Sequence, residues 1–289
     1  MDPQWFTDAV QAPYQEHQVT VDGCPIHYLS WGDPAKPGLV LIHGGMAHAH
    51  WWRFLAPLLT SHYYVVAPDL SGHGDSGYRD QYHRTCWADE IIGVCEHANF
   101  VGKPVIVGHS MGGIVALAVA SLYSDGIAGA VVVDAPLYKP PTREPESSGG
   151  RRTFRFMKPY PTLEKAISRF RLLPDQPCDN HFLIQFLAES SLKKVEDGYI
   201  WKFDMDFFEK TQAPPYESLF PTVNCPWIFL RGEHSSVALP ETEAWLNGLF
   251  GKPMPFMVIP NTHHHLVLDQ PLAFISTIRT VLELWGHRR

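Results

Sequence analysis

A serine flanked by glycines at residues 108–112 constrains the fold of this chain more than any other segment. The five residues read Gly-His-Ser-Met-Gly, with Ser110 at the centre. The apolar run at 104–107 predicts a short buried strand before them, and the small apolar residues at 113–120 predict a packed helix after them. A tight strand-to-helix turn strains the central backbone, which only small flanking residues tolerate. The pattern therefore predicts that the Ser110 hydroxyl projects at the top of a sheet, beside a helix N-terminus that stabilises negative charge.

Composition favours a globular domain that acts on small molecules. The chain has 289 residues, 45% of them hydrophobic, which fits either one large α/β domain or a domain with an inserted subdomain. A formal net charge of -7 argues against nucleic acid or an anionic membrane as partner. The sequence has neither an apolar run of the roughly 20 residues that span a bilayer nor a secretory leader, so we expect a cytoplasmic location.

The cysteines and histidines do not follow metal-binding patterns. Five cysteines are an odd number without C-x-x-C spacing, which disfavours both a disulfide framework and a zinc site. His43, His48 and His50 lie close together, but no carboxylates stand at ligand spacing. Nucleotide-binding glycine motifs are also absent from the sequence. We therefore expect no metal and no cofactor.

Strand and helix patterns alternate along the first half of the chain. A hairpin is expected around Asp22-Gly23, buried strands at 39–42, 63–67 and 129–133, and helices at 51–59 and 85–100. Strands separated by helices predict a doubly wound, mostly parallel sheet.

The pattern changes after the strand at 129–133. Residues 137–220 are rich in proline and carry amphipathic helix signals such as 162–167, which predicts a helical insertion. Strand patterns resume at 227–230 and 257–259, and a last helix is expected at 272–285. We therefore expect a core domain made of residues 1–136 and 221–289, with a helical lid at 137–220.

A serine becomes a nucleophile only when a positioned base removes its proton, usually a histidine oriented by a carboxylate. Three histidines, His263, His264 and His265, follow the last predicted strand. Together with Leu-Ile-His-Gly-Gly at 41–45, Pro-Asp-Leu-Ser-Gly-His-Gly-Asp-Ser at 68–76 and the serine turn, they complete four motifs in order. On these motifs the chain resembles the α/β-hydrolase superfamily, in its small cofactor-free esterase-like group, along nearly its full length.

The resemblance implies an α/β-hydrolase fold with an inserted helical cap and a Ser-His-Asp triad. It also selects His264 as the base, because the base of such enzymes stands seven residues before the proline of an Asp-Gln-Pro signature, here Pro271. His263 then occupies a place that is usually glycine, so His263 and His265 remain alternatives.

The acid departs from the usual family pattern. Where these enzymes often have an aspartate after the strand at 227–230, this chain has Ser235, which cannot carry the negative charge. Some family members place the acid directly after the strand that follows the nucleophile helix, and Asp134 stands there. Glu233, on the same loop but not at the expected position, is the alternative.

The oxyanion of the tetrahedral intermediate needs two preorganised donors. The resemblance assigns them to the backbone N–H groups of Met111 and Gly45, with Met46 as the alternative to Gly45. The motif at 69–76 is expected to be structural, with its glycines and Asp75 fixing the rim of the site.

Two segments of the insertion, 169–174 and 199–204, are similar to lids in a branch of these hydrolases. The aromatic residues Phe182, Trp201, Phe207 and Phe208 could line an apolar pocket or form the core of the lid. Arg151, Arg152, Arg155 and Lys158 form a basic stretch that suits a solvated face or an acidic substrate.

The sequence thus predicts an enzyme that cleaves a carboxylic ester of an apolar small molecule through an acyl-enzyme intermediate. Cleavage of a carbon-carbon bond, a lactone or a thioester on the same scaffold is the alternative, as is a non-catalytic small-ligand receptor. A dehalogenase or epoxide hydrolase is disfavoured, because those relatives use an aspartate nucleophile where this chain has Ser110. The oligomeric state does not follow from the sequence.

Overall fold

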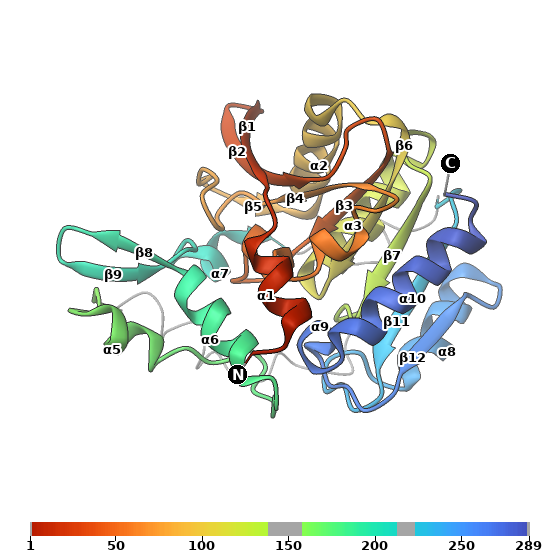
Figure 1. Ribbon diagram of the computed structural model, residues 1–289. Helices are drawn as coiled ribbons and strands as arrows, with labels where there is room; N and C mark the ends of the chain where they lie inside the picture. The colour runs from red at the N-terminus through yellow and green to blue at the C-terminus, as the bar shows by residue number, and fades with distance from the viewer. Residues whose placement is uncertain (1, 138–157, 213–222, 288–289) are drawn as a thin grey trace.

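An eight-stranded sheet forms the centre of the computed structural model, which describes residues 2–137, 158–212 and 223–287 (Figure 1). The strands lie in the order β1-β2-β4-β3-β6-β7-β11-β12. Only β2 runs against its neighbours, and the other pairs are parallel, which confirms the mostly parallel sheet. The bounds are β1 Gln15–Val21, β2 Cys24–Trp31, β3 Pro37–Ile42, β4 Tyr64–Pro68, β6 Val101–His109, β7 Gly129–Val133, β11 Trp227–Gly232 and β12 Phe256–Ile259.

The first two strands form the expected hairpin. Asp22 and Gly23 connect them with φ of 46° and 74°. Positive φ at both central residues is the requirement of the two-residue turn that matches the twist of a sheet, and Asp-Gly meets it at low cost.

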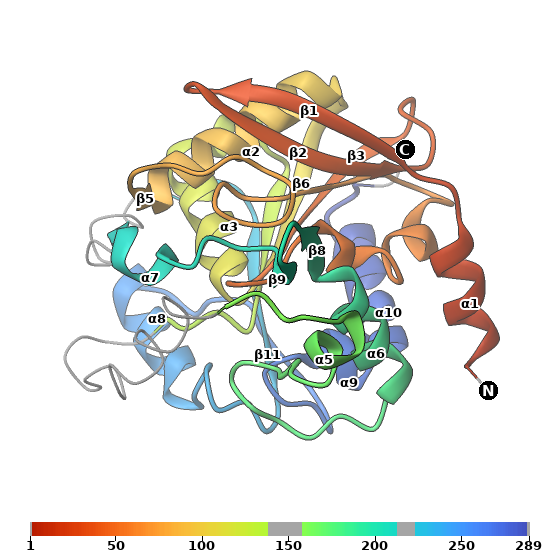
Figure 2. The same ribbon diagram turned by 90° about the vertical axis from the view of Figure 1, so that its left-hand side faces the viewer.

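Helices cover both faces of the sheet (Figure 2), so its central strands are buried on both sides. Leu39 and Leu41 of β3 face the cluster that includes α1 Gln4–Gln11 and α10 Pro271–Leu284. Val40 and Ile42 face the cluster formed with α2 Arg84–Ala98, α3 Met111–Leu122 and α8 Glu241–Phe250. Successive residues of β3 point to opposite faces of the sheet, so the strand contributes apolar side chains to both cores.

The prediction of a single helix at 51–59 is wrong. The structure has two short 3-10 helices, η1 Ala49–Trp52 and η2 Ala56–Leu59. Pro57 lies at the start of η2, and a proline there cannot donate the hydrogen bond that a continuous α-helix needs. By contrast, the helix expected at 85–100 is α2, which ends where Asn99 adopts φ of 51°.

The described part of the insertion, residues 158–212, mixes helices with a hairpin. Its elements are α5 Leu163–Ile167, α6 His181–Ser190, β8 Leu192–Val195, β9 Gly198–Trp201, α7 Phe207–Lys210 and β10 Thr211–Gln212. The hairpin β8–β9 was not expected, because its strands have only 4 residues each and are mostly not buried. Residues 138–157, which include Arg151, Arg152 and Arg155, lie outside the described residues.

The insertion is fastened to the rim of the core at residues 72–82. The N–H of Gly74 donates to the carbonyl of Lys202 at 2.8 Å, and the N–H of Asp204 donates to that of Gly72 at 2.8 Å. The ammonium of Lys202 lies 2.6 Å from the Asp75 carboxylate. In addition, β10 pairs with the short strand β5 Tyr82–His83.

In the described ranges, no helix combines the length and apolar character that crossing a bilayer requires.

Candidate active site

Ser110 lies at the sharp turn between β6 and α3, as the sequence predicted. It has φ of 55°, which is unusual for a residue with a side chain, and its N–H donates to the carbonyl of Val133 at 2.8 Å. The neighbouring glycines allow this turn. A Cβ on Gly108 would lie 2.0 Å from the carbonyl oxygen of Gly112, and one on Gly112 would lie 2.4 Å from that of His43.

Three side chains that are far apart in the sequence meet at this turn. The Nε2 atom of His264 lies 3.0 Å from the Ser110 hydroxyl, and its Nδ1 atom lies 2.8 Å from a carboxylate oxygen of Asp134. His264 is 2% exposed and Asp134 is fully buried. This is the arrangement in which a carboxylate orients an imidazole toward a hydroxyl.

Asp134 directly follows β7 and is held by two further donors. The hydroxyl of Ser235 donates to Oδ1 at 2.5 Å, and the N–H of Gly232 donates to Oδ2 at 2.7 Å. Both donors come from the end of β11 and the loop after it, which is adjacent to β7 in the sheet. Ser235, at the position where the acid was expected, thus contacts Asp134, which follows the neighbouring strand.

The alternative acid and bases lie elsewhere. Glu233 accepts a hydrogen bond of 2.8 Å from the N–H of Asn261, and its side chain is 46% exposed. The His263 ring lies 3.3 Å from the Asp269 carboxylate. The His265 ring is buried beside Trp51, with the ring centres 5.6 Å apart.

The expected oxyanion donors lie in the same cavity as Ser110. Gly45, Met46 and Met111 are among the residues that line it. Met111 is the first residue of α3, and N–H groups of the first helical turn have no partner within the helix. Gly45 and Met46 form a turn in which Met46 has φ of 60°, and both remain candidates for the second donor.

A buried histidine supports the turn that carries Gly45. The ring of His43 accepts a hydrogen bond of 3.0 Å from the N–H of Leu70 and donates one of 2.7 Å to the carbonyl of Gly44. Burial lowers the pKa of His43, which keeps the ring neutral and able to accept.

Asp69 organises the rim loop that was expected to be structural. Its carboxylate accepts hydrogen bonds from the N–H groups of Ala49 and Asp75, at 2.6 Å and 2.9 Å, and contacts the His27 ring at 2.7 Å. A Cβ on Gly74 would lie 2.1 Å from this carboxyl group. Asp75 itself faces Lys202, so it fixes the rim through the insertion.

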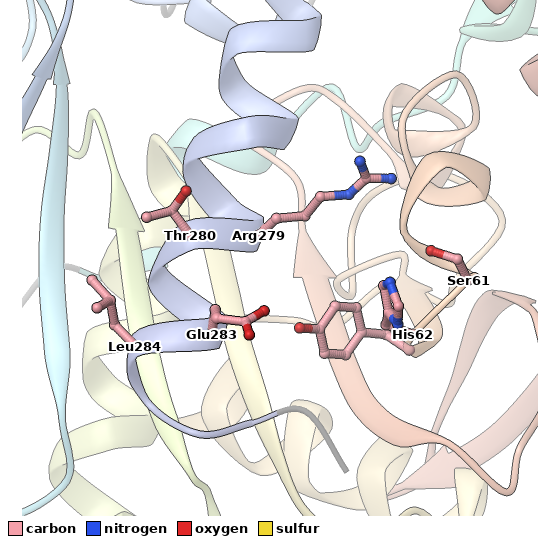
Figure 3. Close-up of a pocket in the computed structure, with 7 residues that line it drawn as sticks. Ser61, His62, Arg279, Thr280, Glu283 and Leu284 are labelled. Atoms are coloured by element: carbon pink, nitrogen blue, oxygen red, sulfur yellow. The ribbon is translucent and has the colours of Figure 1, made fainter.

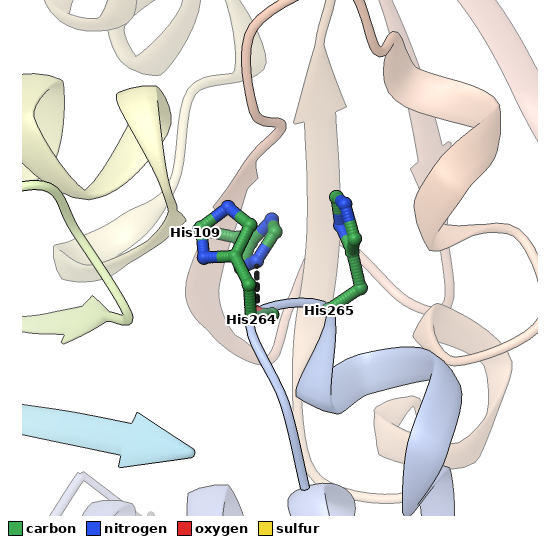
Figure 4. A group of neighbouring side chains, drawn as sticks. All are labelled: His109, His264 and His265. Atoms are coloured by element: carbon green, nitrogen blue, oxygen red, sulfur yellow. Dashed lines mark hydrogen bonds between the residues drawn. The ribbon is translucent and has the colours of Figure 1, made fainter. Parts of the chain in front are cut away.

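Three buried histidines bring ring nitrogens within 4.8 Å of one another at the site: His109, His264 and His265 (Figure 4). The Nε2 atom of His109 donates to the carbonyl of His264 at 2.9 Å, and burial lowers the pKa of His109 to about 3. Both nitrogens of His264 already contact Ser110 and Asp134. A metal ion held by the three rings would have to displace one of these contacts.

Two cavities flank the turn at Gly45. The first, of about 270 Å³, contains Ser110 and Met111 and is otherwise lined mainly by apolar side chains, among them Trp87, Ile114, Phe207 and Phe208. The second, of about 260 Å³, is lined by Trp51, Trp201, Phe170, Phe203 and polar residues of the insertion. Of the aromatic residues singled out in the sequence, Phe182 lines neither cavity and packs on Phe6 with ring centres 4.8 Å apart.

A third hollow, of about 380 Å³, lies away from Ser110 (Figure 3). It is bounded by residues 61–63 and by Arg279, Thr280, Glu283 and Leu284 near the end of α10. None of the candidate site residues lines it.

Comparisons with known proteins agree with this architecture. The sequence profile described as the alpha/beta hydrolase family matches residues 39–277. The chain is 30% identical to human epoxide hydrolase 4 over 117 residues, which are 39% of this chain and 32% of that protein. It is 35% identical to a 2-hydroxy-6-oxo-6-(2'-aminophenyl)hexa-2,4-dienoic acid hydrolase of Metapseudomonas resinovorans over 124 residues, 42% of each chain.

The matched segments therefore span less than half of these two relatives. Among solved structures, an E-2-(acetamidomethylene)succinate hydrolase superimposes with a TM-score of 0.77 at 19% identity, covering 94% of this chain and 100% of the other. At that identity the likeness concerns the fold alone.

Proposed function

Since the chain belongs to the α/β-hydrolase family, we propose that it is a serine hydrolase that cleaves a carboxylic ester of an apolar small molecule through an acyl-enzyme intermediate. The observation that carries the proposal is the continuous contact from the Ser110 hydroxyl through His264 to Asp134. The known hydrolases among its relatives act on several bond types, so the ester specificity rests on this geometry and on the shape of the site.

In the proposed reaction, Ser110 Oγ attacks the ester carbonyl while His264 Nε2 accepts its proton. Asp134 stabilises the resulting imidazolium through Nδ1. The N–H groups of Met111 and Gly45 stabilise the oxyanion. His264 then donates the proton to the leaving alcohol, and a water molecule activated by the same ring hydrolyses the acyl-enzyme.

The identity of residue 110 separates this proposal from epoxide hydrolysis, the activity named for one relative. Epoxide hydrolases of this superfamily attack with an aspartate carboxylate, which forms an alkyl-enzyme ester. A serine alkoxide generated by a histidine is instead suited to acyl transfer, because the oxyanion donors stabilise a tetrahedral carbonyl adduct.

The insertion is proposed to act as the lid of the site. Leu173, Phe207, Phe208 and Thr211 from the insertion line the same cavity as Ser110. A largely apolar cavity of this kind excludes water from the acyl group and favours an apolar substrate.

The test is hydrolysis of 4-nitrophenyl acetate by the wild type, by Ser110→Ala and by the control Ser276→Ala, an exposed serine on α10. We expect Ser110→Ala to lose at least about a thousandfold in kcat, while the control keeps its activity. A fluorophosphonate probe should label the wild type and neither Ser110→Ala nor His264→Gln. Undiminished turnover by Ser110→Ala would exclude the proposed mechanism, and tight ligand binding without labelling would favour a receptor.

A further inference from the structure

The second cavity beside Gly45 is a separate binding site within the same entrance. It shares Gly45, Met46 and Leu173 with the cavity that contains Ser110, but the rest of its lining differs. We propose that this cavity binds the leaving alcohol of the substrate, and that this alcohol is an aromatic ring with a negatively charged substituent. The inference rests on the proposed function, since it divides the substrate into an acyl part and a leaving part.

The position of the base decides which part enters which cavity. The leaving oxygen receives its proton from His264, so the leaving group must extend from Ser110 past the histidine. His265, the next residue, lines the second cavity, whereas Ser110 and Met111 line the first. The acyl part is therefore assigned to the apolar cavity and the alcohol to the second.

Most of the apolar residues that line the second cavity are aromatic. The insertion supplies Tyr160, Phe170 and Trp201, and the centre of the Trp201 ring lies 5.9 Å from the ring centre of each of the other two. Rings at such tilted or edge-on angles form a slot that favours another aromatic ring over a flexible alkyl chain.

Two arginines give the same cavity a positive charge. Arg169 and Arg171 both line it, and neither forms an ion pair with a carboxylate in residues 2–137, 158–212 or 223–287. The guanidinium of Arg171 is held by the carbonyl groups of Ser168 and Phe170, at 3.1 Å and 2.6 Å. In a chain with a net charge of -7, two arginines beside an aromatic slot, neither with a carboxylate partner among the described residues, point to an anionic ligand. The first cavity differs, because its cationic residue, Arg84, is buried and already engaged in an interaction.

The test compares 4-acetoxybenzoate with its neutral methyl ester, which place a charged or an uncharged ring in the leaving position. For each protein, kcat/KM for 4-acetoxybenzoate is divided by kcat/KM for the methyl ester. Comparing this ratio between a variant and the wild type removes the difference in intrinsic reactivity of the two esters. We expect this ratio to fall about tenfold in the double variant Arg169→Gln/Arg171→Gln, in line with the loss of two solvent-accessible ion pairs. The matched control is Arg279→Gln, which removes the same charge from the hollow near the end of α10 (Figure 3).

Direct binding keeps the inference separate from the proposed function. Quenching of tryptophan fluorescence in Ser110→Ala reports 4-hydroxybenzoate beside Trp51 and Trp201, whether or not the wild type is an esterase. We expect 4-hydroxybenzoate to bind more tightly than methyl 4-hydroxybenzoate, with a preference that disappears in the double arginine variant and persists with Arg279→Gln. Equal binding of the two phenols, or a preference unaffected by the arginine changes, would overturn the inference, and loss of ester turnover alone would count only against the proposed function.

Discussion

The hydroxyl of Ser235 donates a hydrogen bond to Oδ1 of Asp134, the same carboxylate oxygen that contacts His264. Ser235 occupies the loop after β11 in which related enzymes often carry their acid, and Asp134 ends the adjacent strand β7. Because parallel neighbouring strands end at the same edge of the sheet, a carboxylate from either strand can reach the histidine. In this chain the carboxylate comes from β7, and the serine on the neighbouring loop donates a hydrogen bond to it.

Asp134→Asn should abolish most of the activity. An asparagine keeps the shape of the side chain but not the charge that stabilises the imidazolium, so we expect kcat to fall by about 10⁴-fold. Glu233→Gln is the matched control, because its carboxylate binds the N–H of Asn261 and not His264. Steady-state kinetics on 4-nitrophenyl acetate distinguish the two, and the reverse ranking would move the acid to Glu233.

The contact between Ser235 and Asp134 predicts that the acid can be moved. Ser235→Ala removes one of three donors to the carboxylate, and we expect kcat to fall by about tenfold, because hydrogen bonds to charged groups contribute about 1.5–3 kcal/mol. The double variant Asp134→Asn/Ser235→Asp restores a carboxylate at the usual family position and should recover part of the activity lost in Asp134→Asn. If the double variant were no more active than Asp134→Asn, the geometry at position 235 would not support an acid.

His264 and its neighbours give a test of the base. We expect His264→Gln to lose activity to the level of Ser110→Ala, because residues of a triad act as a unit. His263→Gln should stay within about threefold of the wild type, since the His263 ring contacts Asp269 and not Ser110. Labelling by a fluorophosphonate measures both variants, and loss of labelling in His263→Gln would reassign the base.

The sequence predicts the core of this fold well because the signals are local. The turn at Ser110, the Asp-Gly hairpin and the strand β7 each depend on residue types within a few positions. The continuous helix expected at 51–59 does not form. Its apolar residues favour a helix, but Pro57 interrupts it. The α1 helix and the hairpin β8–β9 do not follow from the sequence patterns because the helix has only 8 residues and the strands only 4 each, which is too short for a periodic pattern to be distinctive.

The site illustrates what local patterns cannot provide. The serine turn and the histidine segment are visible in the sequence, but the contact of Asp134 with Ser235 depends on which strands are neighbours. The available signal for Ser235 is a serine at the usual acid position, which by itself predicts only that a charge is missing there. The second cavity likewise joins Trp51 from the core with Phe170 and Trp201 from the insertion, which only the folded chain brings together.

The close packing behind Ser110 predicts a large destabilisation for a glycine substitution there and a small stabilisation for one at an open helix position. Gly108→Ala would place a Cβ 2.0 Å from the carbonyl of Gly112, and we expect a loss of about 3 kcal/mol or more in unfolding free energy. Gly248→Ala, within α8, meets nothing within 4 Å and should stabilise the protein by about 0.5–1 kcal/mol. Urea denaturation measures both, and a stable Gly108→Ala protein would contradict the packing described for the turn.

Buried neutral histidines predict a loss of stability in mild acid. Burial lowers the pKa of His73 to about 3, whereas an unfolded histidine titrates near 6.5. Between these values the unfolded chain binds a proton that the folded chain does not, so stability is highest above pH 6.5 and falls as the pH decreases toward 3. From pH 7.5 to 5.5, one such group lowers the unfolding free energy by about 1.4 kcal/mol. Urea denaturation of His73→Phe at both pH values should therefore show a decrease smaller by about 1.4 kcal/mol than in the wild type. An equal decrease in both proteins would mean that His73 has the same pKa in the folded protein as in the unfolded chain, which would contradict the prediction.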